Sequence, residues 1–167
     1  MQQSGIRFAQ PADYPTIEAI ENTADRPLID WLGATLWPAA TPAEVRAAHA
    51  GFLLVYEMDG AVVGFAHVLE LDAVAHLEQL SVAPAHGRRG YGRHLLNAAV
   101  DEARYRGHRR ITLRTYADVP WNAPFYRRCG FVEEQPSTEF DRHLVEVEER
   151  LGLTHCGRRV QLALDLS

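Results

Sequence analysis

Apolar residues recur along the chain with two different periods, so strand-like and helix-like segments alternate. Alternating patterns and short apolar runs predict strands at residues 6–8, 52–57, 61–71, 76–82, 110–116, 131–132 and 160–166. Asp59-Gly60 joins the second and third of these, and it predicts a tight hairpin because Gly accepts positive φ. The interleaving predicts a single domain over residues 1–167 with a mixed sheet, of the α/β or α+β class.

Helical spacing of apolar residues predicts the segments between the strands. The first helix is expected to begin at Asp13, an N-cap residue, and to end before Pro27. Thr41-Pro42-Ala43-Glu44 predicts a capping box for a short second helix that Gly51 stops. Residues 28–38, rich in Trp and Leu, are expected to form a short helix or an ordered loop. Three further helices are expected: a long one that carries Leu95, Leu96, Ala99 and Ala103 and ends at Gly107, a short one at 123–129, and one that carries Phe140, Leu144, Val147 and Leu151 and ends at Gly152.

Composition excludes several classes of protein. The chain has 167 residues, 47% of them hydrophobic and 23% charged, which is unlike an intrinsically disordered chain. No apolar run approaches the ~20 residues that span a bilayer, and the N-terminus lacks a signal-peptide pattern, so a cytoplasmic protein is expected. Cys129 and Cys156 have no metal-ligand spacing, and we expect both to be reduced and structural, with no metal bound.

The charge is unevenly distributed over an acidic chain. The net charge of −5 argues against binding to nucleic acid or to an anionic membrane surface. Arginines nevertheless concentrate between residues 88 and 114, and acidic residues between 133 and 149. A locally basic stretch suggests a small bound anion, while two solvated faces of opposite sign are the alternative interpretation.

A glycine-rich turn follows the strand that ends at Val82. Pro84 breaks the strand pairing, and Gly87, Gly90 and Gly92 precede a long amphipathic helix. A strand, a glycine turn and a helix N-terminus together form a cradle for an anion, because free N–H groups and the helix dipole point at the ligand. The turn is not a Walker loop, since no Lys-Ser/Thr follows, and its spacing differs from the dinucleotide-binding fingerprint.

The same segment resembles the acetyl-CoA loop of the GNAT N-acetyltransferase superfamily. Val82 and Pro84 match its Val-x-Pro, and Gly90 and Gly92 match its Gly-x-Gly. Gly87 stands where the family more usually has Gln or Arg, and the neighbouring Arg88 is placed to replace that charge. Residues 121–131, Trp-Asn-Ala-Pro-Phe-Tyr-Arg-Arg-Cys-Gly-Phe, resemble the second family motif, and the order of strands and helices fits as well.

This resemblance implies a GNAT-like acyl-CoA N-acyltransferase fold, with a twisted, mostly antiparallel sheet flanked by helices and splayed at the fourth strand. It implies transfer of the acetyl group of acetyl-CoA to a primary amine of a small molecule, a peptide N-terminus or a lysine. The amine would attack directly in a ternary complex. The residues implied to contact the cosubstrate are Leu80, Val82, Gly87, Arg88, Arg89, Gly90, Gly92, Asn122 and Tyr126. For Asn122 the family's residue usually lies about three positions upstream, at Val119. Homodimer formation through the C-terminal strand stays open.

Acetyl transfer to an amine requires a proton acceptor and benefits from a proton donor for the departing thiolate. Tyr126 matches the family's general acid, and a phenol stays protonated at neutral pH. Glu78 lies four residues before Val82, where the family carries bases, and His76 is a candidate relay. The alternatives are a half-buried aromatic residue for Tyr126 and a solvated or ion-paired strand residue for Glu78.

The resemblance implies an acceptor pocket between residues 25–37 and Trp121. Aromatic rings there, with the nearby acids Asp25, Asp30 and Glu78, would suit a cationic amine. Packing of Trp31 and Trp37 onto the sheet is the alternative. Two other functions stay open at this point. One is a CoA-binding sensor or scaffold of the same fold without turnover, and the other is a nucleotide binder that uses the glycine turn for phosphate.

Overall fold

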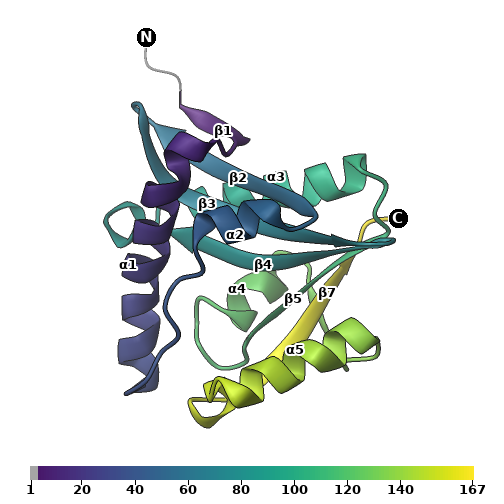
Figure 1. Ribbon diagram of the computed structural model, residues 1–167. Coiled ribbons are helices and arrows are strands. Elements are labelled where there is room, and N and C mark those ends of the chain that lie inside the picture. Colours follow the sequence, from purple (N-terminus) through teal and green to yellow (C-terminus); the bar gives the residue numbers. More distant parts are fainter. Residues whose placement is uncertain (1–3) are drawn as a thin grey trace.

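A seven-stranded mixed sheet runs through the protein, seen in a computed structural model that describes residues 4–167 (Figure 1). The strand order is β1-β2-β3-β4-β5-β7-β6. Among the described strands only β4 and β5 pair in parallel, so the predicted mixed, mostly antiparallel sheet is confirmed. The strands are β1 (Gly5–Phe8), β2 (Gly51–Met58), β3 (Ala61–Leu71), β4 (Val74–Val82), β5 (Arg110–Tyr116), β6 (Val132–Glu134) and β7 (Arg159–Asp165).

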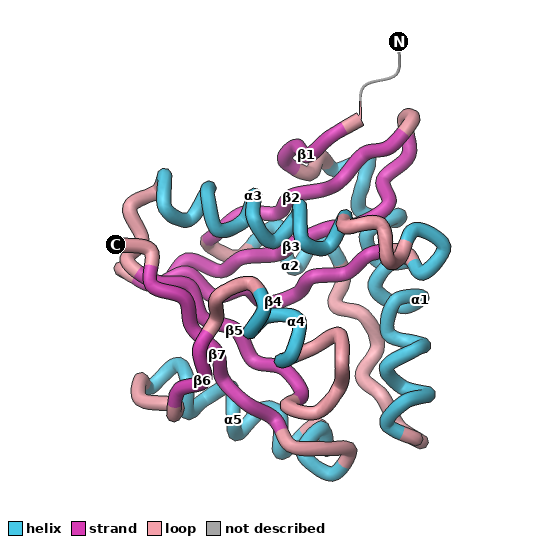
Figure 2. Tube along the Cα trace, turned by 180° about the vertical axis from the view of Figure 1, so that it is seen from behind, coloured by secondary structure: helices cyan, strands magenta, loops and turns pink. Residues whose placement is uncertain are grey.

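Helices cover both faces of the sheet. They are α1 (Tyr14–Leu32), α2 (Ala43–Ala48), α3 (Tyr91–Tyr105), α4 (Ala123–Arg128) and α5 (Glu139–Arg150). α1, α2 and α5 lie on one face, and α3 and α4 lie on the other, which Figure 2 shows from behind. The larger core cluster lies under α3, where Leu95, Leu96 and Ala99 are buried. Within residues 4–167 no helix is both long and apolar enough to cross a membrane.

The hairpin between β2 and β3 forms as predicted. Asp59 has φ 51° and Gly60 has φ 82°, the pair of positive values that a tight hairpin turn requires. The next hairpin partner, β4, begins two residues before the predicted start at residue 76.

The predicted end of the first helix is wrong. α1 continues through Pro27 to Leu32, although a proline inside a helix costs about 3 kcal/mol relative to Ala. Contacts with the C-terminal half offset that cost. Trp31 packs edge-on against Trp121 with ring centroids 5.3 Å apart, and Leu32 lies beside Gly157. The predicted short helix or loop over residues 28–38 is therefore the last turn of α1 followed by an ordered loop.

The helix caps also differ from the predicted ones. Asp13 precedes α1, but its carboxylate binds the guanidinium of Arg7 and the N–H of Gln10 rather than capping α1. The capping box predicted for α2 is wrong, because Pro42 takes the N-cap position. The N–H of Ala43 donates instead to Glu18 Oε1 of α1 at 2.8 Å, so α1 caps α2.

β4 and β5 diverge, as the family resemblance implies. Their pairing runs only from Val74 opposite Arg110 to Leu77 opposite Leu113. Beyond these pairs the two strands separate, and Figure 1 shows them close together near the C-terminus and apart at the other end. The gap between the unpaired halves of β4 and β5 is called the notch below.

Candidate active site

Glu78 lies at the position where β4 loses both of its neighbours. On the β3 side, His67 pairs with Gln79 and Val68 pairs with Leu77, which leaves Glu78 in a bulge without a partner. On the β5 side, pairing ends at Leu77. Bulges re-aim a side chain and interrupt pairing, and they are common beside active sites. Glu78 therefore lies where the notch begins, one residue beyond the last pair of β4 and β5.

The surroundings of Glu78 favour a role of its carboxylate as the proton acceptor. Burial raises the pKa of its carboxyl group, although 37% of the side chain is exposed. The positive charge of Arg46 opposes this shift, whereas the negative charge of Glu21 adds to it. A carboxylate with a raised pKa accepts a proton more readily than an ordinary glutamate.

His76 is adjacent to Glu78 but is held neutral. Its Nε2 lies 3.7 Å from Glu78 Oε2, and its Nδ1 lies 2.8 Å from the hydroxyl oxygen of Thr112. Burial lowers the pKa of His76 to about 4, so at neutral pH the two groups form no ion pair. The edge of Phe140 closes the other side of the ring, with the centroids 5.2 Å apart. A relay role for His76 stays a prediction.

Tyr126 lies on α4, next to the notch. Phe125 and Phe131 pack edge-on against its ring. Burial raises the pKa of the phenol well above its usual value, so Tyr126 stays protonated at neutral pH. Its hydroxyl makes no hydrogen bond with residues 4–167, and the hydroxyl oxygen is accessible to solvent. The hydroxyl is therefore available as a donor.

Asn122 is engaged within the chain. Its side-chain oxygen accepts from the hydroxyl of Thr115 at 2.8 Å and from the N–H of Tyr116 at 3.5 Å. These bonds fix the start of α4 to the end of β5, and with it the position of Tyr126. A contact between Asn122 and the cosubstrate stays a prediction.

The glycine turn presents free donors at the start of α3. No side chain of residues 4–167 caps this helix, and Gly90, with φ 84°, is its N-cap residue. Arg88 also adopts a left-handed conformation, with φ 61°. The side chains of Arg88, Arg89 and Arg93 are exposed, and within residues 4–167 none of them pairs with a carboxylate. This arrangement fits a pyrophosphate, because uncapped helix amides and mobile cations both favour an anion.

Alanine substitutions at two glycines of this turn distinguish the effect of backbone strain from the effect of contact with a ligand. Gly90→Ala is expected to destabilise the protein by about 1 kcal/mol, because L-residues resist positive φ. Gly92→Ala places a methyl group 3.8 Å from Val82 Cγ2 in ordinary helical backbone, so stability should hold or rise by up to about 1 kcal/mol. If a phosphate lies against this turn, Gly92→Ala should nevertheless weaken acetyl-CoA binding. Thermal denaturation and calorimetry check both expectations, and unchanged affinity in Gly92→Ala would argue against this close approach.

Leu80 and Val82 line the β4 side of the notch. Leu80 pairs with Ala66 and Val82 pairs with Gly64 on β3, whereas neither has a partner on β5. The backbone groups on that side of β4 are consequently free to pair with an extended ligand, as the family resemblance implies.

Aromatic side chains bridge the notch at the end of α1. Trp37 donates its indole N–H to Asp25 at 3.2 Å and lies 6.4 Å from the ring of Tyr116. Trp31 and Trp121 touch, yet they are 58% and 44% exposed, so packing into the core does not describe Trp31. Of the acids predicted near the acceptor, burial raises the pKa of Asp25, whereas Asp30 is exposed beside Arg26.

Two buried ionic clusters beside the notch were not predicted from the sequence. Arg46 of α2 binds Glu21 of α1 at 2.7 Å and His67 of β3 at 2.9 Å. Glu148 of α5 accepts hydrogen bonds from both Arg114 and Arg159. One signal could have found the acids: Glu21 is four residues after Ile17, and Glu148 is four residues after Leu144, so each lies on the apolar face of its helix.

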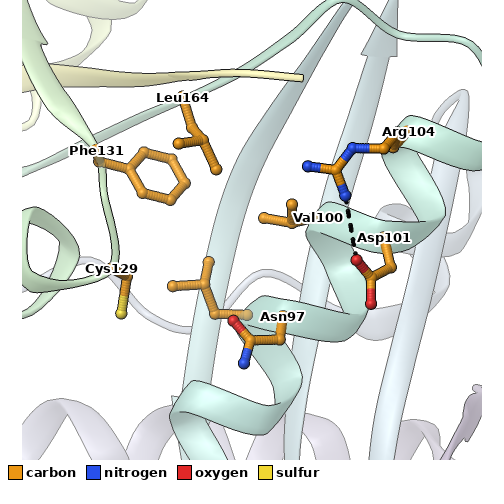
Figure 3. A pocket seen from close by; sticks show the side chains of 8 residues that line it. Asn97, Val100, Asp101, Arg104, Cys129, Phe131 and Leu164 are labelled. Carbon is orange, nitrogen blue, oxygen red and sulfur yellow. Dashed lines mark hydrogen bonds and ion pairs between the residues drawn. The ribbon is translucent and has the colours of Figure 1, made fainter. Parts of the chain in front are cut away.

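The cavity between α3 and the segment after α4 is separate from these groups. It has a volume of about 400 Å³ and is lined by Leu96, Asn97, Val100, Asp101, Arg104, Cys129, Phe131 and Leu164. Figure 3 shows Phe131 and Leu164 on one side and the Asp101–Arg104 ion pair on the α3 side. Neither Glu78 nor Tyr126 lines it, so it holds no candidate base or acid. Cys129 borders it as a free, half-buried cysteine, in agreement with the packing role expected for it.

Comparison with known proteins identifies the family. Residues 16–131 match the acetyltransferase (GNAT) family. The mycothiol acetyltransferase of Geodermatophilus obscurus is 32% identical over 124 residues, which are 70% of this chain but 39% of that protein, so the chain spans well under half of this relative. The ribosomal-protein-S18-alanine N-acetyltransferase of Escherichia coli shares the fold, with a TM-score of 0.72 and 22% identity over 99% of this chain and 95% of that one. A GNAT family acetyltransferase from Brucella melitensis, solved in complex with acetyl-CoA, is 25% identical over 79% of this chain and 84% of that one, with a TM-score of 0.63. The family match spans more than half of the sequence, and the chain belongs to the GNAT family of acetyltransferases.

Proposed function

We propose that the protein transfers the acetyl group of acetyl-CoA to a primary amine by direct attack within a ternary complex. The observation that carries this proposal is the pair of groups that border the notch. Glu78 stands in an unpaired bulge with a raised pKa, and Tyr126 has a free, protonated hydroxyl. These are the proton acceptor and the proton donor that amide formation from a thioester uses.

A protonated amine loses two protons from its nitrogen, and the departing sulfur gains one. The ammonium group gives its first proton to Glu78, directly or through water, and the neutral nitrogen then attacks the thioester carbonyl carbon. As the C–S bond breaks, the departing sulfur takes the phenolic proton of Tyr126. The nitrogen loses its second proton, which returns to the phenolate directly or through water, so the products are a neutral amide and the free thiol of CoA. Glu78 then releases its proton to solvent, which restores the starting state.

Acetyl-CoA as cosubstrate is supported by the turn before α3 and by the relatives. The uncapped start of α3 with three unpaired arginines suits a pyrophosphate, and the unpaired edge at Leu80 and Val82 suits the pantetheine arm. The Brucella melitensis relative was solved with acetyl-CoA. The acceptor is proposed to be a small molecule or a peptide amine.

Ligand-induced stabilisation tests the cosubstrate first. The unfolding temperature is measured with acetyl-CoA, CoA, ATP and NAD, since a ligand at a hundredfold excess over its Kd stabilises the fold by about 2.7 kcal/mol. Selective stabilisation by acetyl-CoA is expected, followed by thiol release with a panel of amines. Stabilisation by ATP alone would favour a nucleotide binder, and acetyl-CoA binding without transfer to any amine would favour a sensor.

Glu78→Gln is expected to lower kcat/KM about tenfold to a hundredfold near pH 7. In the wild type, activity falls as the pH drops through the pKa of Glu78, and this fall is the acid limb of the pH–activity profile. The raised pKa moves the acid limb to a higher pH than an ordinary glutamate would give. The variant lacks that limb. Its activity follows the fraction of unprotonated amine instead, so its deficit should shrink as the pH rises. A pH series of thiol-release rates checks this.

Glu146→Gln is the matched control, because Glu146 is exposed on α5. It should keep the pH profile of the wild type. A Glu78→Gln profile with the same acid limb as the wild type would show that another group accepts the proton.

A further inference from the structure

Two guanidiniums share one carboxylate inside the C-terminal half, between the sheet and α5. Arg114 of β5 donates to Glu148 of α5 at 2.7 Å, and Arg159 of β7 donates to the same carboxylate at 3.1 Å. The side chains of Arg114, Glu148 and Arg159 are 8%, 9% and 15% exposed. The other buried carboxylate of α5, Asp141, accepts instead from backbone N–H groups at the start of its own helix. Both guanidiniums therefore depend on the one carboxylate of Glu148.

The donors of this cluster exceed the acceptors that the chain provides. Arg114 Nη1 is sealed from solvent and has no hydrogen-bond partner among residues 4–167. Arg159 directs Nε and Nη2 to Glu148. Its Nη1 makes no hydrogen bond within the described part of the chain, and this atom is accessible to solvent. An accessible guanidinium nitrogen that has no acceptor of its own is a donor for an oxyanion.

Arg159 lies within electrostatic reach of both candidate catalytic groups. β7 places it opposite Tyr116, and its guanidinium carbon lies 4.6 Å from the centre of that ring. Its charge acts on Glu78 and on Tyr126 alike, lowering the pKa of each against the stronger effect of burial. Because Tyr116 is on the unpaired part of β5, its β7 partner Arg159 lies on the C-terminal wall of the notch.

The opposite wall has the opposite sign. Arg46 binds Glu21 of α1 at 2.7 Å, and its charge also acts on Asp25 of α1 and Glu78 of β4. Burial raises the pKa of all three carboxyl groups, as expected where acids gather with one counter-charge. An ammonium group is favoured beside this wall, and a carboxylate is favoured beside Arg159.

We propose that the acceptor is a small amino acid, with its amine against Glu78 and its carboxylate bound by Arg159. This inference rests on the proposed function, because it assigns the class of molecule that supplies the amine. A zwitterion matches both walls of the notch, whereas a simple amine leaves the unused donor of Arg159 without an acceptor. Arg159 is then a residue that determines specificity, and the carboxylate it binds takes no part in the chemistry.

Pairs of amino acids and their amides test this proposal. L-alanine, L-leucine, L-phenylalanine and γ-aminobutyrate are each compared with the corresponding amide, which keeps the amine but lacks the negative charge. The carboxylate raises the pKa of its neighbouring amine, so intrinsic reactivity at neutral pH favours the amide. A preference for the acid must therefore come from the protein. We expect kcat/KM to be about tenfold to a hundredfold higher for at least one acid than for its amide.

Variants of Arg159 locate the source of the preference. Arg159→Met should abolish it, and Arg159→Lys, which keeps the charge, should restore part of it. Arg158→Met is the matched control, because Arg158 is 60% exposed and lies 3.4 Å from Glu133. This control should discriminate as the wild type does. Equal rates for acids and amides in the wild type, or a preference that survives in Arg159→Met, would overturn the proposal and leave the proposed function standing.

Binding of the same pairs decides the proposal independently of turnover. Calorimetry is performed in the presence of CoA, with circular dichroism to confirm that each variant is folded. Tighter binding of an acid than of its amide, lost in Arg159→Met, supports the proposal even if no acetyl group is transferred. Equal binding, or no binding of any of the acids, overturns it. Absence of both acetyl-CoA binding and acetyl transfer would instead refute the proposed function.

Discussion

Tyr126→Phe is expected to lower kcat about 10²- to 10³-fold while the affinity for acetyl-CoA stays unchanged. The substitution removes only the hydroxyl, and the ring keeps its edge-on contacts with Phe125 and Phe131. Without the phenolic proton, the sulfur must leave as a bare thiolate or wait for water. Thiol-release kinetics give kcat, and calorimetry with acetyl-CoA gives the affinity.

Tyr105→Phe controls for the loss of a phenol in general, since Tyr105 is 86% exposed at the far end of α3. It should behave as the wild type. If Tyr126→Phe reduced kcat by less than about threefold, water would suffice as the proton donor and the acid role would be wrong. A protein that binds CoA only as a sensor would change little in either variant.

The parts of the fold that follow from local chemistry could be predicted. The hairpin at Asp59-Gly60 and the helix end at Gly107 each depend on residues that accept positive φ, and all three residues adopt it. The course of α1 through Pro27 could not be predicted in this way. It depends on contacts of Trp31 and of Leu32 with residues that are far away in the sequence, and no local pattern reports them.

The same distinction between local sequence patterns and long-range contacts applies to the candidate site. Glu78 and Tyr126 were placed from motifs near the glycine turn and at the start of α4. The bulge that exposes Glu78 depends on the register between β3 and β4, which a single sequence does not reveal. The ion pairs could not be predicted from local patterns either, because Arg46 is 25 residues from Glu21 and Arg114 is 34 residues from Glu148.

The contacts that extend α1 also shape the candidate acceptor site. α1 carries Glu21 and Asp25 toward the notch, and its last turn rests on the C-terminal half through Trp31. A helix that ended before Pro27 would lose this support. The proline is consistent with a site that needs the end of α1 in one position, since its cost is offset only when those contacts form.

Arg46→Met is expected to destabilise the protein by about 3–5 kcal/mol, because it leaves Glu21 buried without its counter-charge. The two side chains are 4% and 8% exposed. His67 adds to the cluster: a guanidinium can only donate, so His67 Nδ1 accepts the bond at 2.9 Å, and burial lowers the pKa of His67 to about 3. Chemical denaturation near pH 7 measures the loss. Arg26→Met is the control, since Arg26 and Asp30 are both 68% exposed and 3.8 Å apart, and it should cost less than about 1 kcal/mol.

The pH dependence and a double variant separate a lost ion pair from lost packing. Burial raises the pKa of Glu21 even with Arg46 present, and without Arg46 it should rise further. A carboxyl group whose folded pKa exceeds its unfolded value of about 4.3 destabilises the fold fully above the folded pKa, and the effect disappears as the pH falls below the unfolded one. The cost of Arg46→Met should therefore shrink between about pH 7 and pH 5, and the double variant Arg46→Met/Glu21→Met should recover most of the stability. A cost that is equal at both pH values and is not recovered in the double variant would mean that Arg46 stabilises the helices by packing, and that the charge of Glu21 is not the source of the loss.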